Sequence, residues 1–227
     1  MPRPDLRPLP VTTAPLRRIP QLLLGLCLYG TSMAMQVHAA LGLNPWDVLH
    51  QGLTTRIPLS FGVVTAITGG VVLLLWIPLR QRMGVGTVAN VVVIAFSVDV
   101  ALSLLPQPVG IGWRIAMMAG GIVLNGVASA AYIGARLGPG PRDGLMTGLA
   151  ARTGRSIRLV RTGIEVVVLG TGWLLGGTVG VGTVLYALAI GPLTQLFLPL
   201  FTVRDRRAAA PGTPAVPPDA APGTLAA

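Results

Sequence analysis

The sequence has no lysine, one cysteine and only seven acidic residues among its 227 residues. A single cysteine, Cys27, excludes an internal disulfide. The chain also lacks a glycine-rich phosphate loop, a cysteine cluster and a nucleophile elbow, and this argues against an ATP-driven pump and against an enzyme. His38 and His50 are too isolated along the chain to predict a metal site. We therefore expect neither enzymatic activity nor a bound cofactor.

Hydrophobic residues make up 52% of the chain and charged residues only 11%, and the mean hydropathy is +0.71. Long apolar runs of this kind predict an all-α polytopic membrane protein. In a soluble protein, the net charge of +10 would suggest a nucleic-acid partner. Here the arginines lie at the ends of the apolar runs, where they indicate membrane topology. We therefore expect a lipid bilayer, and no nucleic acid, as the partner.

Six apolar segments are predicted as transmembrane helices. Each has about 20 residues, enough at 1.5 Å per residue to cross a hydrocarbon core of about 30 Å. They are 20–40, 60–79, 84–105, 112–135, 157–176 and 179–201. Residues 1–19 are expected to form a disordered basic tail, and the Ala/Pro-rich residues 202–227 a second one. The first apolar run imitates a signal peptide, but it also belongs to the repeat described next, which favours a retained helix.

One motif occurs twice in the chain, at an offset of 96 residues. Asp47 in the first copy corresponds to Asp143 in the second, and the flanking sequences are similar. The first copy is NPWDVLHQGLTTR at 44–56 and the second is GPRDGLMTGLAAR at 140–152. The identical pairs are Pro45 and Pro141, Asp47 and Asp143, Leu49 and Leu145, Gly52 and Gly148, Leu53 and Leu149, and Arg56 and Arg152. At the same offset, GVGTV stands at both 84–88 and 180–184. A register held over some eighty residues predicts a duplicated unit.

The two units are expected at 20–105 and 112–201, with three spanning helices each. Because three is an odd number, the second unit must enter the membrane from the opposite side, and this predicts inverted repeats. With the N-terminus inside, every arginine except Arg56 and Arg114 falls on the cytoplasmic side, as the positive-inside rule prefers. We therefore expect a multi-pass protein of a bacterial plasma membrane with both termini cytoplasmic.

Each motif is typical of a short helix. Asn44 suits the N-cap and Pro45 the first turn, and Asp47 stands where it can accept from free backbone N–H groups. About nine residues cannot span a bilayer, so each short helix is interfacial or re-entrant. Two interpretations stay open. Either the motif aspartates cap these helices and the following arginines, Arg56 and Arg152, fasten the next turn, or both helices line a pathway, one from each face.

At this motif the chain resembles the YczE/YyaS/YitT family of bacterial integral membrane proteins. The resemblance is carried by GLNPWDVL at 42–49 and by GPGPRDGL at 138–145, and it extends roughly from residue 20 to residue 201. It implies a multi-pass membrane fold and says nothing about substrate or mechanism.

Ionisable groups within membrane helices are candidates for function. Asp99 has no basic residue within one or two helical turns, and its repeat partner is Gln195. It could serve as the carboxylate that couples transport to a proton or cation, or it could make an interhelical hydrogen bond. Glu165 follows Arg161 by one helical turn, which favours an ion pair. Asn125 is expected to form an interhelical hydrogen bond.

Two functions remain as hypotheses. The first is a small secondary transporter or permease that moves a small solute together with a coupling proton or cation. The second is a membrane scaffold or regulator whose basic loop, 136–161, holds a partner or anionic lipid headgroups. A polar cavity between the repeats that reaches Asp99 would favour the transporter, and apolar packing there would favour the scaffold.

Overall fold

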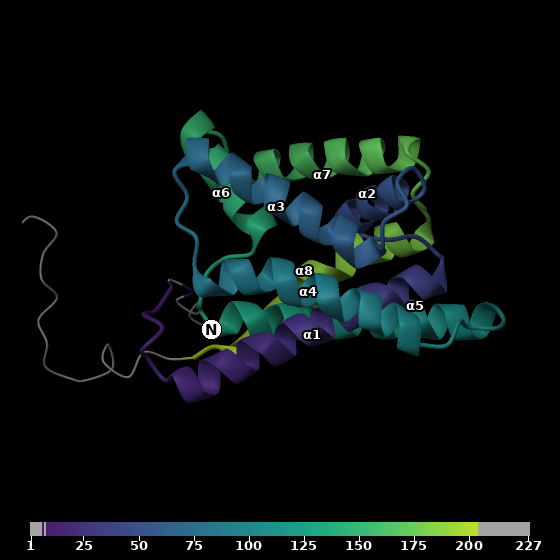
Figure 1. Ribbon diagram of the computed structural model, residues 1–227, viewed down its shortest axis with the longest axis horizontal. Helices are drawn as coiled ribbons and strands as arrows, with labels where there is room; N and C mark the ends of the chain where they lie inside the picture. Colours follow the sequence, from purple (N-terminus) through teal and green to yellow (C-terminus); the bar gives the residue numbers. More distant parts are fainter. Residues whose placement is uncertain (1–5, 7, 204–227) are drawn as a thin grey trace, which may run out of the picture.

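The computed structural model describes Leu6 and residues 8–203. This part of the chain forms eight α-helices and no β-strand (Figure 1). The helices are α1 (Pro15–Ala39), α2 (Pro45–Thr54), α3 (Phe61–Leu79), α4 (Val85–Leu104), α5 (Ile111–Gly134), α6 (Pro141–Thr153), α7 (Ile157–Leu174) and α8 (Val181–Phe201). The six long helices run back and forth along one direction, and the short helices α2 and α6 lie near opposite ends of the bundle (Figure 1).

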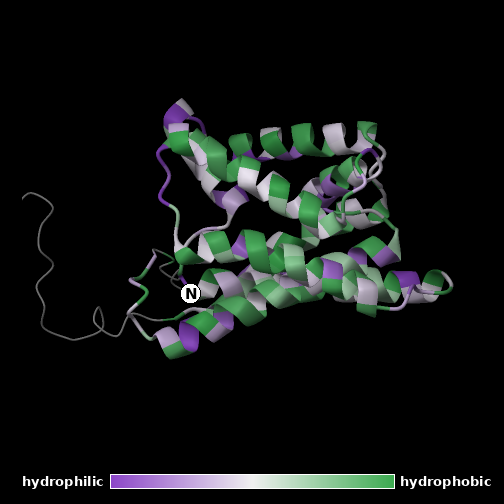
Figure 2. Ribbon diagram, in the orientation of Figure 1, coloured by the Kyte–Doolittle hydropathy of each residue, from purple (hydrophilic) through white to green (hydrophobic). Residues whose placement is uncertain are grey.

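Five of the helices, α1, α3, α4, α5 and α8, are long and apolar enough to cross a membrane. Figure 2 shows hydrophobic residues along the long helices and hydrophilic residues gathered mainly towards the two ends. Helix α7 has 18 residues and carries Arg158, Arg161 and Glu165, so its composition is more polar than that of the other long helices. The expectation of a helical membrane protein is therefore confirmed, with five spans that satisfy length and composition among the described residues.

The expected helix boundaries agree with the structure to within two residues, except at the first helix. Helix α1 begins at Pro15 instead of residue 20, because Arg18 is fully buried and binds backbone carbonyl groups at the end of α5. The expected basic tail therefore ends earlier than predicted. Residues 1–5 and 7 of that tail, and the C-terminal tail from residue 204 onward, lie outside the described residues.

The helices form two layers (Figure 1). One layer holds α1, α4, α5 and α8, and the other holds α2, α3, α6 and α7. Helix α1 lies between α4 and α5, and the main apolar core sits there around Leu26, Met33 and Val98. In the second layer, α2 packs on α7 and α6 packs on α3. The principal contact between the layers is made by α3 and α4.

Helices related by the offset of 96 residues make matching contacts. The pair α1–α4 corresponds to α5–α8, and the pair α2–α7 corresponds to α6–α3. One correspondence fails, because α3 packs along α4 whereas α7 and α8 hardly touch. The two halves of the chain therefore share a packing plan and differ in one interface.

Candidate functional site

A cavity of about 310 Å³ lies between the two layers, and all eight helices contribute to its wall. Its polar lining comes from both halves of the chain. These residues are Tyr29, Asn44, His50, Thr65, Thr68, Asn90, Ser129, Tyr132, Arg142, Asp143, Arg161, Glu165, Tyr186, Thr194 and Gln195. Such a concave site with convergent polar groups is the usual form of a small-molecule site.

Both short helices bring their N-terminal ends to this cavity. Helix α2 starts as the motif predicts, since the Asn44 side chain accepts a hydrogen bond from the backbone N–H of Asp47 at 3.1 Å. Helix α6 starts at Pro141 after Gly140, and Trp76 Nε1 donates to the carbonyl oxygen of Pro141 at 3.0 Å. The free N–H groups and the helix dipoles of both helices are therefore directed towards the centre of the molecule.

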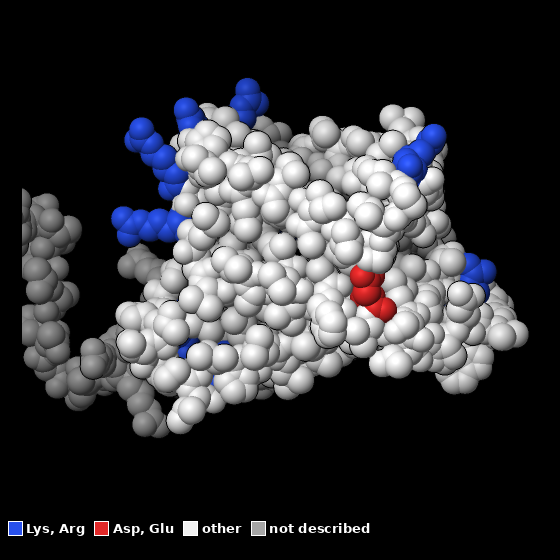
Figure 3. Space-filling model, viewed as in Figure 1, with Lys and Arg blue, Asp and Glu red and all other residues white. Residues whose placement is uncertain are grey.

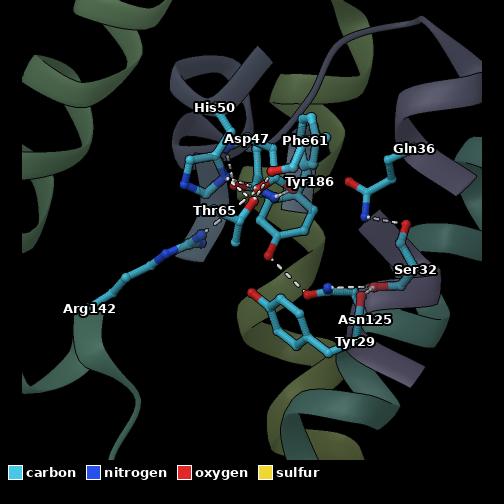
Figure 4. A network of polar contacts seen from close by, with 11 residues as sticks. Tyr29, Ser32, Gln36, Asp47, His50, Phe61, Thr65, Asn125, Arg142 and Tyr186 are labelled. Atoms are coloured by element: carbon cyan, nitrogen blue, oxygen red, sulfur yellow. Dashed lines mark hydrogen bonds and ion pairs between the residues drawn. The ribbon is translucent and has the colours of Figure 1, made fainter. Parts of the chain in front are cut away.

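A buried polar network joins the two motifs across the cavity (Figure 4). The Asp47 carboxylate is fully buried and accepts from the Asn44 amide. Its Oδ1 atom lies 3.2 Å from His50 Nδ1 and 3.8 Å from the guanidinium of Arg142, which comes from α6 (Figure 4). Arg142 also stacks on the ring of Trp46, 4.9 Å from its centroid. The basic residue of the second motif therefore neutralises the acidic residue of the first.

His50 lies between two polar groups. Its Nδ1 atom lies 3.2 Å from the Thr65 hydroxyl and 3.2 Å from Asp47 Oδ1. The Thr65 hydroxyl also donates to the carbonyl oxygen of Phe61 at 2.8 Å. Burial lowers the pKa of His50 below its ordinary value.

Asp143 is the least compensated carboxylate in the cavity. Its Oδ2 atom accepts from the Tyr132 hydroxyl at 3.2 Å. No arginine among the described residues lies within ion-pair distance of Asp143. The surface that Asp143 exposes faces the cavity, and burial within the protein raises the pKa of this carboxyl group. Asp143 can therefore accept a hydrogen bond or a cation from a bound ligand, or carry a proton.

Two further candidates make the contacts that the sequence suggested. Arg161 and Glu165 form an ion pair with 2.9 Å between Nε and Oε1, and both residues line the cavity. Asn125 is fully buried and connects three helices: its amide donates to the Ser32 hydroxyl at 2.7 Å and its Oδ1 accepts from the Tyr186 hydroxyl at 3.0 Å (Figure 4).

Asp99 and Gln195, which share a repeat position, do not share an environment. Asp99 accepts hydrogen bonds from the Ser60 hydroxyl and from the backbone N–H of Gly62 at 2.7 Å, so it holds the start of α3. It is not among the residues that line the cavity, whereas Gln195 is. The polar cavity therefore reaches Gln195 and not Asp99, so the observation that would favour the transporter is met only in part.

Arg56 and Arg152 lie outside the cavity. Arg56 donates to the carbonyl oxygen of Leu175 at 3.4 Å, and Arg152 donates to that of Pro78. Arg56 lies just after α2 and Arg152 lies in the last turn of α6, and each binds the C-terminal end of the long helix beside it. These contacts therefore differ from the interpretation in which the arginines fasten the next turn of the chain, because each arginine binds a long helix of the other half.

The sequence reading missed the aromatic part of the site. Tyr29 and Tyr132 line the cavity with ring centroids 6.1 Å apart, and Tyr186 lies in the same wall. His50 stands three residues after Asp47, and residues three apart share a helix face. This spacing in the sequence is a signal for the contact between the two side chains.

The fold and the cavity define a helical membrane protein with a polar chamber between two layers of helices. Residues 16–199 match a family of unknown function (DUF6198), and the chain belongs to this family. It is 39% identical over 186 residues to an uncharacterized protein of Haemophilus influenzae, with 82% of this chain and 85% of the relative covered. It is 31% identical over 195 residues to the uncharacterized membrane protein YczE of Bacillus subtilis, with 83% and 90% covered.

A third relative is the uncharacterized protein YyaS of Bacillus subtilis, which is 22% identical over 192 residues, with 81% of this chain and 96% of the relative covered. The resemblance to YczE and YyaS is therefore confirmed. No solved structure matches the chain.

Proposed function

We propose that this membrane protein is a small secondary transporter or permease whose substrate site is the central cavity. The observation that carries the proposal is that the N-terminal ends of α2 and α6 line one cavity. In secondary transporters built from inverted repeats, the binding site lies at the repeat interface and uses helix ends within the membrane. The cavity also contains the charged residues Arg142, Asp143 and Glu165, and such groups mark solute or ion pathways in membrane proteins.

The repeats are proposed to be inverted, with three spanning helices each. The matched contacts of α1–α4 with α5–α8, and of α2–α7 with α6–α3, support this arrangement. The proposed orientation places the turn after α3 and the turn after α6 in the cytoplasm. Exposed arginines gather at this end, including Arg82, Arg152 and Arg155, and Figure 3 shows more of them at this end than at the other. The positive-inside rule supports the orientation.

Asp143 is proposed as the group that couples transport to a proton. Its carboxyl group faces the cavity, lacks an arginine partner among the described residues and is held only by Tyr132 among the side chains. A carboxyl group with a raised pKa can bind and release a proton near neutral pH more readily than an ordinary aspartate. The ion pairs of Asp47 and Glu165 make these two residues weaker candidates.

The proposal is tested with purified protein in vesicles that contain a pH-sensitive dye. A panel of small organic cations, anions and neutral solutes is added, and proton movement is recorded. We expect saturable movement with at least one solute, its loss in Asp143→Asn, and its retention in Val167→Ala, which alters an exposed lipid-facing position of α7. Vesicles that move no solute of the panel, tested with correctly folded protein, would contradict the proposal.

A scaffold or regulatory function is the second candidate. Arg152, Arg155 and Arg158 are exposed beside the turn between α6 and α7, a placement that favours anionic lipid headgroups. Replacement of all three by glutamine would remove this contact and leave the cavity intact. Loss of binding to anionic lipid vesicles in that variant, together with unchanged binding in Asp143→Asn, would favour the scaffold over the transporter.

A further inference from the structure

A crevice of about 290 Å³ lies between α7 and α8, and it is lined mainly by aliphatic side chains such as Val166, Leu169 and Leu188. Pro45 and Glu165 belong to the wall of this crevice and also to the wall of the central cavity. The two spaces are therefore neighbours, with these residues in the wall of both. One is polar and lies within the protein, and the other is apolar and lies between two helices with outward-facing aliphatic residues.

The sequence explains why the crevice exists on one side only. In the other half, α3 packs on α4 through two glycines: a Cβ atom on Gly62 would lie 2.1 Å from the carbonyl oxygen of Ala95, and one on Gly69 would lie 3.1 Å from Val91. At the corresponding positions 96 residues later, α7 carries Arg158 and Glu165. At the close α3–α4 contact, each glycine has only a hydrogen atom as its side chain. The long side chains of Arg158 and Glu165 would not fit in an interface that is packed as closely.

Helix α8, the other wall of the crevice, also lacks the close contact that α4 makes with α3. Gly191 of α8 occupies the position that corresponds to Ala95, and nothing lies within 4 Å of a Cβ atom built there. Since α7 lacks both glycines, it cannot approach α8 as α3 approaches α4. The crevice between α7 and α8 therefore results from the side chains of the second repeat. A simple exchange of conformations between the two repeats would not close it.

We propose that the crevice is a lateral entrance from the bilayer, through which the cavity takes an amphiphile with an alkyl chain and a positively charged amine head. This inference rests on the proposed function and names its substrate class. The alkyl chain lies against Val166, Leu169 and Leu188, and the head passes Glu165 to reach the cavity.

The charge of the head follows from the residues that remain uncompensated. Arg161 is paired with Glu165 at 2.9 Å, and Arg142 is directed to Asp47 at 3.8 Å. Asp143 has no such partner among the described residues. The acidic residues of this network therefore outnumber its arginines by one, since Asp47, Asp143 and Glu165 face only Arg142 and Arg161. An ammonium group therefore completes the site, whereas a sulfate or phosphate head would face an unpaired carboxylate.

The chemistry of the two neighbouring spaces favours an amphiphile over a protein helix. The wall of the crevice is mainly aliphatic, and the neighbouring cavity holds charged groups. An occupant that reaches both spaces is therefore apolar at one end and charged at the other.

The test measures binding directly, without transport. The protein is placed in nanodiscs of phosphatidylcholine, and its affinity for decylamine, decyl sulfate and methylamine is determined by calorimetry. We expect decylamine to bind at least tenfold more tightly than either of the other two compounds. Equal affinity for decyl sulfate would overturn the charge assignment, and equal affinity for methylamine would overturn the role of the crevice.

Two variants separate the crevice from the surrounding surface. Val166→Trp fills the crevice and should weaken decylamine binding at least tenfold, whereas Val167→Trp, on the neighbouring position outside the crevice, should leave it unchanged. Leu188→Phe narrows the crevice from α8 and serves if Val166→Trp does not fold. Unchanged affinity in a folded crevice variant would overturn the proposal. If decylamine binds tightly but no proton movement is detected in vesicles, the binding site is supported and the transporter function is rejected.

Discussion

Arg18 and Arg114, which are 96 residues apart, cap the ends of each other's helices. Arg18 lies near the start of α1 and donates to the carbonyl oxygens of Ala135 and Arg136 at the end of α5, at 2.7 and 2.9 Å. Arg114 lies near the start of α5 and donates to the carbonyl oxygens of Ala39 and Ala40 at the end of α1, at 2.7 and 2.6 Å. The two contacts are equivalent under the repeat and lie at opposite ends of the antiparallel pair.

This reciprocal capping leads to a prediction about stability. Arg18 is fully buried and also binds the carbonyl oxygens of Leu9, Pro10 and Thr13. A hydrogen bond to a charged group contributes about 1.5–3 kcal/mol, and buried carbonyl groups left without a donor add to the cost. We therefore expect Arg18→Ala to lower the free energy of unfolding by about 3 kcal/mol or more.

Thermal unfolding of purified protein in detergent measures this effect. Arg114 is partly exposed, so Arg114→Ala should cost less, about 1.5–2 kcal/mol. The exposed neighbour Arg17 provides the control, and Arg17→Ala should change stability by less than about 0.5 kcal/mol. Equal melting temperatures for the Arg17 and Arg18 variants would contradict the structural role given to Arg18.

The α3–α4 interface should be sensitive to a single methyl group. A Cβ atom on Gly62 would clash with the carbonyl oxygen of Ala95, so Gly62→Ala should force α3 away from α4 and destabilise the protein by about 1–3 kcal/mol. Gly163 in α7 faces open space, and Gly163→Ala should be neutral or stabilising by up to about 1 kcal/mol. The same melting experiment compares the two, and a neutral Gly62→Ala would show that α3 does not approach α4 this closely.

Asn125 should act as a link between α1, α5 and α8. Asn125→Leu removes both of its hydrogen bonds and leaves the hydroxyl groups of Ser32 and Tyr186 without these partners. We expect a loss of about 2–3 kcal/mol. Tyr186→Phe removes only one of the two bonds and keeps the ring, so it should cost about 1 kcal/mol. A double variant, Asn125→Leu with Tyr186→Phe, should cost less than the sum of the two, because the residues share one bond.

Asp99 and Asp143 should respond differently to loss of charge. In Asp99→Asn, the remaining carbonyl oxygen still accepts from Gly62, so stability should change by less than about 1 kcal/mol. Proton coupling should survive in this variant, since Asp99 is not among the cavity-lining residues. Loss of coupling in Asp99→Asn, with retention in Asp143→Asn, would return the coupling role to Asp99.

The sequence predicted the helices well because apolar runs and their charged ends are local features. It also predicted the starts of α2 and α6, since N-caps and first-turn prolines act within a few residues. The repeat relates Asp99 to Gln195, but it does not show that their contacts differ: Asp99 binds the start of α3, and Gln195 lines the cavity. The two positions differ because α3 carries glycines where α7 carries Arg158 and Glu165.

The centre of the site could not be derived from the sequence, because it depends on how distant segments pack. Tyr29, His50 and Tyr186 come from three helices and meet only in the folded protein. The offset of 96 residues also relates Arg18 to Arg114, but both were interpreted only as topology signals. Their capping role depends on the antiparallel packing of α1 against α5.

The inverted arrangement of the two repeats is the central claim, and cysteine labelling tests it most directly. Leu59 and Arg155 are equivalent under the repeat, and both are exposed. In a Cys27→Ala background, Leu59→Cys and Arg155→Cys are treated in intact cells with a reagent that does not cross the membrane. We expect Leu59→Cys to react, together with Pro108→Cys, and Arg155→Cys to react only after the membrane is opened, together with Arg82→Cys. Reaction of Leu59→Cys and Arg155→Cys from the same side would contradict the inverted repeat.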